Sequence, residues 1–440
     1  MVYSVLAQAQ RKYSFKHLFD TIIRINICNK EGIPMAGPIT HVDGGTITTA
    51  RGFQAGATYV GIKTFSEDKM DMGLLISDTS CSVAGVFTKS SLVSPSVTVN
   101  RETIAAGGSV RGLVVNSGIA NAGVGEQGYI DAKEMASIAA DGLGVKPDEV
   151  LVFSTGVIGV ELPMTLIKKG VDEIKLSDDG GNFLARSMMT TDTRTKETGV
   201  IVNLGGTDVN ICGVAKGSGM IHPNMATMLC FVATDAAVDQ DFLRSALPDI
   251  ADSTLNMLDI DGDTSTNDSL VVLANGAAGN TPIDAGSDDA VAFVEALTEV
   301  LIQLTRQLAQ DGEGASRLIV AEVQGAKNLA DARLAAKTIT SSLLVKSAVY
   351  GSDPNWGRLI MALGKSGAEM VESKIDLYIN GVCIMEAGKP VPFHRDAVVA
   401  LMRGDEVTFG VNLNISDGRA TSWGCDLTEE YVVINSAYTT

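Results

Sequence analysis

Short apolar runs alternate with stretches of helical periodicity along most of the chain, from about residue 52 onward. Residues 113–116 and 150–153 are runs dominated by Leu and Val, the pattern of buried β-strands. The first run leads into a glycine-containing loop at 117–123, and the second leads into the segment 154–159. Between the two runs, apolar residues recur every three to five positions, which predicts a helix that carries Ile130, Met135, Ile138 and Leu143.

The longest predicted helix extends from Asp288 to about Gln310. Two acidic residues, Asp288 and Asp289, stand where the positive end of a helix dipole favours them. One apolar stripe follows at helical spacing, which indicates that one side of this helix is buried. The stripe consists of Val291, Val294, Leu297, Leu301, Leu304 and Leu308.

A smaller region beyond this helix combines helices with β-hairpin signals. Asn380-Gly381 stands between the strand-like runs 375–379 and 382–385. Asp417-Gly418 stands in the same way between 411–416 and 419–423. Both dipeptides are typical of two-residue hairpin turns. Hairpins mixed with helices favour a layered α+β fold over a doubly wound parallel sheet.

Composition limits the kind of partner that the protein can have. The 440 residues are 45% apolar and 20% charged, which is typical of a globular chain of two or three domains. The net charge of −18 disfavours nucleic acid and anionic membranes, so a small-molecule partner is expected. Six scattered cysteines and four histidines form no zinc or disulfide pattern, which favours a reducing compartment. No apolar stretch is long enough to span a membrane.

The first forty residues are basic, in contrast to the rest of the chain. Two origins remain open: an organelle presequence, or an untranslated leader that precedes a true start at Met35. We therefore exclude residues 1–40 from the fold prediction. A cytoplasmic location is expected, or an organelle matrix if this leader is a presequence. The basic residues are Arg11, Lys12, Lys16, Arg24 and Lys30, against the acidic Asp20 and Glu31.

Two features that suggest metal or acid–base chemistry are better explained structurally. The acidic run 259–268 has Thr264 and Leu270 where a calcium-binding EF-hand loop needs Gly and Glu. A turn rich in side-chain-to-backbone hydrogen bonds explains the run instead. His222 has no orienting carboxylate nearby in the sequence, so a packing or surface role is expected. We predict no metal site.

The segment 216–229, Lys-Gly-Ser-Gly-Met-Ile-His-Pro-Asn-Met-Ala-Thr-Met-Leu, carries the chemistry of the chain. In one interpretation it is a turn that enters a buried strand, and Thr227 only starts that strand. In the other, the Thr227 hydroxyl attacks the carbonyl of Ala226, and hydrolysis of the resulting ester frees Thr227 as a new N-terminus. The α-amine of Thr227, with an ordinary pKa of about 7.7–8.0, can then act as the base for its own hydroxyl.

This segment resembles the self-cleavage signature of the ornithine acetyltransferase family, the bifunctional glutamate N-acetyltransferases of arginine biosynthesis. The resemblance extends from about Thr46 to the C-terminus, and its motifs occur in order at compatible spacing. The other matching motifs are Gly52-Phe53, Gly61-Ile62-Lys63, Asn116-Ser117-Gly118, 154–159, Met189-Thr190-Thr191-Asp192-Thr193, 261–268, 311–315, 353–358 and 434–440.

The resemblance implies an assignment for each site residue. Cleavage between Ala226 and Thr227 would give an α chain 1–226 and a β chain 227–440, with Thr227 as the nucleophile. Thr155 and Gly156 would form the oxyanion hole. Lys216 is expected to pair with the substrate carboxylate and Glu313 with its ammonium group. The complete set of implied substrate-binding residues is Thr190, Lys216, Thr227, Glu313, Asn435 and Thr440.

The implied reaction moves acetyl from N²-acetyl-L-ornithine to L-glutamate without a metal or redox cofactor, and acetyl-CoA is a possible second donor. The implied architecture is a layered α/β sandwich, with a catalytic domain at 41–310, a smaller α+β domain at 311–440, and an α₂β₂ assembly. Two alternatives stay open: a self-cleaved N-terminal-nucleophile amidohydrolase or aminopeptidase that acts on small amides, and a catalytically silent binding protein of the same fold.

Overall fold

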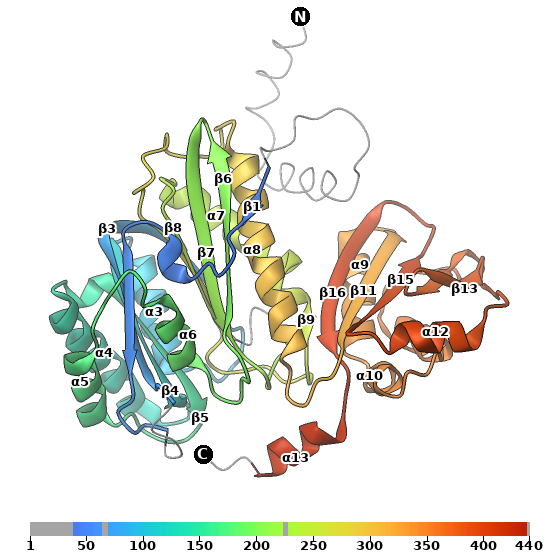
Figure 1. Cartoon of the computed structure of the whole chain (residues 1–440), viewed down its shortest axis with the longest axis horizontal. Helices are drawn as coiled ribbons and strands as arrows, with labels where there is room; N and C mark the ends of the chain where they lie inside the picture. Colours follow the sequence, from blue (N-terminus) through green and yellow to red (C-terminus); the bar gives the residue numbers. More distant parts are fainter. Residues whose placement is uncertain (1–37, 64–68, 223–227, 438–440) are drawn as a thin grey trace, which may run out of the picture.

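The computed structural model describes residues 38–63, 69–222 and 228–437. The described chain forms two mixed β-sheets with helices packed against them, so the predicted α+β class is confirmed (Figure 1). None of the helices in these ranges is long and apolar enough to cross a membrane. Within these same ranges, four short 3₁₀ helices complete the connections: Ile47–Thr49, Pro147–Glu149, Leu255–Met257 and Glu372–Lys374.

The first sheet has nine strands in the order β1-β6-β7-β8-β10-β3-β4-β5, and β2 pairs with β3 beside this path. The long strand β3 joins its two halves, because its first part pairs with β2 and β4 and its last part pairs with β10. The strands are β1 (Thr40–His41), β2 (Phe53–Thr58), β3 (Met72–Phe87), β4 (Val110–Ile119), β5 (Val150–Val157), β6 (Lys196–Leu204), β7 (Thr207–Lys216), β8 (Leu229–Thr234) and β10 (Ser269–Ala274).

The two halves of this sheet face each other across a buried core, in which the rings of Phe153 and Phe231 lie 4.5 Å apart. Helices cover both outer faces, which gives a four-layered sandwich (Figure 1). One face carries α4 (Gly125–Leu143) and α5 (Met164–Glu173), and the other carries α7 (Gln240–Ser253) and α8 (Ala290–Gln310). Two further helices, α3 (Pro95–Ala105) and α6 (Gly181–Met188), pack beside β3.

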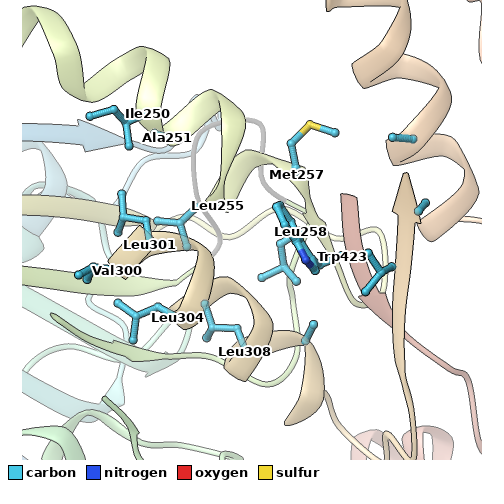
Figure 2. Packing of buried hydrophobic residues seen from close by; sticks show 14 of the residues in the cluster. Ile250, Ala251, Leu255, Met257, Leu258, Val300, Leu301, Leu304, Leu308 and Trp423 are labelled. Atoms are coloured by element: carbon cyan, nitrogen blue, oxygen red, sulfur yellow. The ribbon is translucent and has the colours of Figure 1, made fainter. Parts of the chain in front are cut away.

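Helix α8 follows the predicted apolar stripe and connects the sandwich to the second sheet. One side of α8 packs on β6 and β7, and another contacts β11 (Leu318–Ala326) and β16 (Gly418–Cys425) of the second sheet. Figure 2 shows Leu301, Leu304 and Leu308 along this helix, with Leu301 beside Leu255 and Leu308 nearest to Leu258 and Trp423. All three leucines are fully buried, so the stripe belongs to a core that the two sheets share.

The second sheet has seven strands in the order β14-β13-β12-β15-β11-β16-β9. Three helices, α9, α10 and α11, pack together beside it, and α12 contacts β15. The strands of this sheet are β9 (Leu258–Asp259), β11 (Leu318–Ala326), β12 (Asp376–Ile379), β13 (Val382–Glu386), β14 (Lys389–Pro390), β15 (Glu406–Asn412) and β16 (Gly418–Cys425). The helices of this part of the chain are α9 (Leu329–Thr340), α10 (Leu343–Tyr350), α11 (Gly357–Lys365), α12 (Arg395–Met402) and α13 (Glu429–Ala437).

One predicted hairpin in this region is confirmed and the other is wrong. Strands β12 and β13 pair around Asn380 and Gly381, which both have positive φ as a tight hairpin turn requires. Strands β15 and β16, on either side of Asp417, do not pair with each other. The earlier strand β11 lies between them, parallel to β15 and antiparallel to β16. The buried apolar face of β11 accounts for this arrangement, which a local turn signal cannot reveal.

Candidate active site

A cavity of about 160 Å³ opens where the ends of β5, β7 and β8 meet the residues that follow α8. It brings together every predicted site residue that the structure describes, from segments far apart in the sequence. The remaining three, Ala226, Thr227 and Thr440, lie outside the described residues. The predicted residues that line the cavity are Thr155, Gly156, Thr190, Lys216, Glu313 and Asn435.

Thr155 and Gly156 lie near the end of β5, which continues beyond the predicted 150–153. Its neighbour β4 also continues to Ile119, so the loop predicted at 117–123 starts later than expected. The two strands remain paired in parallel, with Gly118 opposite Gly156. A Cβ on Gly156 would lie 2.2 Å from the carbonyl carbon of Gly118, and its φ is +134°. Only glycine fits this close approach.

Lys216, the last residue of β7, connects two hydroxyls of the cavity wall. Its Nζ donates hydrogen bonds to Thr155 Oγ1 at 3.1 Å and to Thr190 Oγ1 at 3.0 Å. Because the Thr155 oxygen accepts from Lys216, its own hydrogen can be donated to an acceptor in the cavity. Burial lowers the pKa of Lys216 below its usual value, although the carboxylate of Asp192 opposes this shift.

Glu313 supplies a carboxylate to the same cavity. Its backbone N–H donates to Ser218 O at 2.8 Å, and its Oε2 accepts from Asn435 Nδ2 at 2.6 Å. Asn435 belongs to α13, which extends from the second sheet back toward the sandwich (Figure 1). Gly219 leaves the space that the carboxylate occupies, because a Cβ there would lie 2.5 Å from both carboxylate oxygens. The cavity therefore brings the cationic Lys216 and the anionic Glu313 together from different elements.

The acidic run 259–268 contributes more to the site than sequence reasoning assigned to it. Residues 265–268 line the cavity. Asn267 Nδ2 donates to Ala120 O at 2.6 Å and to Ser154 O at 2.8 Å, which ties this run to the end of β5. Asp261 accepts hydrogen bonds from the backbone N–H groups of Met220 and Ile221, as the predicted side-chain-to-backbone bonding requires. Among the residues described, no cluster of three or more potential metal ligands occurs.

His222 has an orienting carboxylate that is distant in the sequence, and its predicted packing or surface role stays a prediction. Its Nδ1 lies 2.7 Å from Asp259 Oδ1, and Asp259 Oδ2 lies 3.0 Å from Lys346 Nζ. Burial alone would raise the pKa of the Asp259 carboxyl, but Lys346 and His222 together hold it below its usual range. The carboxylate comes 37 positions after the histidine, which explains why the local sequence gave no sign of it.

The family model of the ArgJ family matches residues 54–440. The arginine biosynthesis bifunctional protein ArgJ of Dehalococcoides mccartyi is 47% identical over 92% of this chain and 100% of its own length. The protein of that name from Bacillus subtilis is 42% identical over 90% of this chain and 97% of its own. Such identity over nearly the whole chain shows that this layered sandwich is an acetyltransferase of arginine biosynthesis. The chain belongs to the ArgJ family.

Two solved structures are also similar. The ArgJ protein of Bacillus halodurans is 44% identical with a TM-score of 0.47, and the match covers 47% of this chain and 98% of that chain. The ornithine acetyltransferase of Mycobacterium tuberculosis, solved in complex with ornithine, is 29% identical with a TM-score of 0.39. That match covers 43% of this chain and 100% of the other.

Proposed function

We propose that the enzyme transfers acetyl from N²-acetyl-L-ornithine to L-glutamate through an acetyl ester on Thr227, after cleaving its own chain between Ala226 and Thr227. The observation that carries the proposal is the convergence of the six described candidate residues on one small cavity. Membership of the ArgJ family supports the same reaction. The nucleophile itself follows from the segment 216–229 and from the chemistry of an N-terminal threonine.

In the first half of the reaction, Thr227 Oγ attacks the acetamide carbonyl carbon and the α-amine of Thr227 takes the hydroxyl proton. The oxyanion that forms accepts hydrogen bonds from the Thr155 hydroxyl and the Gly156 N–H. Each such donor is worth about 3–4 kcal/mol in other enzymes. When the C–N bond breaks, the proton passes to the departing amine of ornithine. In the second half, the neutral amine of glutamate attacks the ester, and the Thr227 oxygen regains a proton as the new amide forms.

The charges of Lys216 and Glu313 suit the two charges of acetylornithine. A lysine ammonium has three N–H groups, so Lys216 can bind the substrate carboxylate while it holds Thr155 and Thr190. A carboxylate accepts several hydrogen bonds, so Glu313 can pair with the side-chain ammonium while Asn435 holds Oε2. The proposed route needs no metal or redox cofactor, and acetyl-CoA would be a second acetyl donor. We further propose an α₂β₂ assembly of the cleaved chains.

Intact mass of the purified protein beside Thr227→Ala and Thr227→Ser variants tests the proposal. We expect two chains with a junction at Ala226/Thr227 in the wild type, one chain in the alanine variant, and cleavage in the serine variant. Acetylornithine with a labelled acetyl group should then give labelled acetylglutamate when glutamate is present, and acetyl-CoA should be assayed as a donor in parallel. A single wild-type chain would overturn the mechanism, and release of free acetate without an acceptor would identify an amidohydrolase.

A further inference from the structure

A buried ionic cluster lies behind the cavity, formed by Asp192, Lys196 and Asp311. Lys196 Nζ lies 2.5 Å from Asp192 Oδ1 and 2.5 Å from Asp311 Oδ2. The side chains of Lys196 and Asp192 are fully buried, and that of Asp311 is 4% exposed. Moving charged groups from water into the protein interior costs free energy even when the groups are paired. The gain in stability therefore does not by itself explain this cluster.

Each carboxylate of the cluster accepts a hydrogen bond from the backbone of a segment near the site, and Asp311 Oδ2 accepts from the N–H of Thr193 at 3.1 Å. Asp192 accepts hydrogen bonds from the N–H of Thr190 at 2.9 Å and from the N–H of Gly217, the neighbour of Lys216, at 2.7 Å. The segment around Asp311 leads directly to Glu313. In that segment, the carbonyl of Asp311 accepts from Ser218 Oγ at 2.6 Å. Lys196 therefore joins the segments that carry Thr190, Lys216 and Glu313.

The charges of the cluster and of Lys216 act on one another. Burial alone would raise the pKa of the Asp192 carboxyl, but Lys196 and Lys216 hold it well below its usual range. Asp192 in turn favours the charged form of Lys216, against the effect of burial. Among the described residues, the other charges that act on Lys216 are Lys196 and, with smaller effect, Glu313 and Asp268; Lys216 also acts on Lys63.

We propose that the Asp192–Lys196–Asp311 cluster positions the acetyl-transfer site: it fixes the spacing between Lys216 and Glu313, and Asp192, which binds the backbone N–H of Gly217, places a negative charge beside Lys216. The three members are positioning residues, because they act through neighbouring residues rather than on the substrate. That role in substrate recognition rests on the proposed function. The electrostatic control of Lys216 is independent of the reaction, so the two ideas can fail separately.

The Asp192→Asn variant tests the electrostatic part without any enzyme assay. Competitive labelling with acetic anhydride, read by peptide mass spectrometry across pH, reports the titration of Lys216, which lines the cavity. We expect the midpoint of Lys216 to move to lower pH in the variant. Each unit of such a shift raises the labelling rate about tenfold at pH values below the midpoint.

Asp235→Asn is the matched control. Asp235 is also a fully buried carboxylate that binds a basic side chain and a backbone N–H, those of Arg51 and Asn210. It lies just beyond the far end of β8, about 20 Å from Leu229 at the cavity. This control should leave the Lys216 midpoint unchanged. If Asp192→Asn moves the midpoint no further than Asp235→Asn, the proposal is overturned.

The Asp311→Asn variant tests the positioning part through its steady-state kinetics. It also serves as a second variant if Asp192→Asn does not fold. We expect the KM for acetylornithine to rise at least tenfold, with a smaller change in kcat, because Glu313 is displaced relative to Lys216. Loss of activity only in proportion to the unfolded fraction would reduce the cluster to a structural role and refute the positioning. Absence of acetyl transfer in the wild type would instead refute the proposed function and leave the labelling result standing.

Discussion

Replacing Gly219 by alanine should displace the Glu313 carboxylate while leaving the fold intact. A Cβ at this position would lie 2.5 Å from Cδ, Oε1 and Oε2 of Glu313, whereas non-bonded carbon contacts are about 3.5–4.0 Å. The carboxylate must therefore move by about 1 Å or more. It is the far end of a side chain, and Gly219 has no positive φ that alanine would resist. The free energy of unfolding should change little.

The functional cost of this shift can be worked out from the contacts of Glu313. The moved carboxylate loses its 2.6 Å hydrogen bond from Asn435 and its alignment with the substrate ammonium. A hydrogen bond to a charged group is worth about 1.5–3 kcal/mol, which corresponds to a factor of about 10–150 in affinity. The KM for acetylornithine should rise by this factor. The KM for glutamate should rise less, because glutamate has no side-chain ammonium.

Steady-state kinetics with each substrate, together with thermal unfolding, measure these effects. Gly364→Ala is the matched control, since Gly364 lies in α11 with no atom within 4 Å of an added Cβ. That control should keep wild-type kinetics. A KM for acetylornithine within twofold of the wild type in Gly219→Ala would refute the assignment of Glu313. Equal rises in KM for both substrates would show that the methyl group obstructs the cavity in general.

Three further predictions follow from other contacts. Thr155→Val removes a donor to the oxyanion and should lower kcat by about 10²–10³; an unchanged kcat in the processed enzyme would exclude the Thr155 hydroxyl from that role. Leu304→Ala, in the buried stripe of α8, should lower the free energy of unfolding in urea by about 2–5 kcal/mol, and a loss below about 1 kcal/mol would contradict the packing in Figure 2. The pKa of Asp192 is lowered in the folded state, so its contribution to stability is present above its unfolded value of about 3.9 and is lost as pH falls through the folded value. The stability difference between wild type and Asp192→Asn should therefore be largest near neutral pH and shrink in acid, and a difference that grows in acid would reverse this reasoning.

Local patterns in the sequence were sufficient for the elements but not for all of their partners. The stripe of α8 and the turn at Asn380-Gly381 each depend on residues close together in the chain, and both predictions are confirmed. The placement of β15 and β16 depends on β11, which pairs with both and whose residues precede their partners in β15 by 88 positions, so the turn at Asp417 was misleading. The segment 117–119 looked like a loop because its glycine breaks the apolar run, yet it stays paired with β5.

The site was only partly predictable for a similar reason. A resemblance located Thr155, Lys216 and Glu313, whose roles stay predictions, and the structure shows that they share one cavity. The ionic contacts behind them were missed, because Lys196 and Asp311 are 115 positions apart. The motifs that contain Asp192 and Asp311 do not indicate that both aspartates bind one lysine. The contact between His222 and Asp259 was missed for the same reason. Buried charges are recognised through their partners, and these partners meet only when the chain folds.

The order of strands in the first sheet determines what a cut after residue 226 does to the molecule. Such a cut falls between β7 and β8, which pair along their length, and β10 holds β8 on its other edge. The later fragment then contributes two central strands, with strands of the earlier fragment on both sides. Neither fragment alone can complete the sheet, and each would expose unpaired edges that favour aggregation. The cut protein would thus be an obligate two-chain complex, in which unfolding is also dissociation and stability depends on protein concentration.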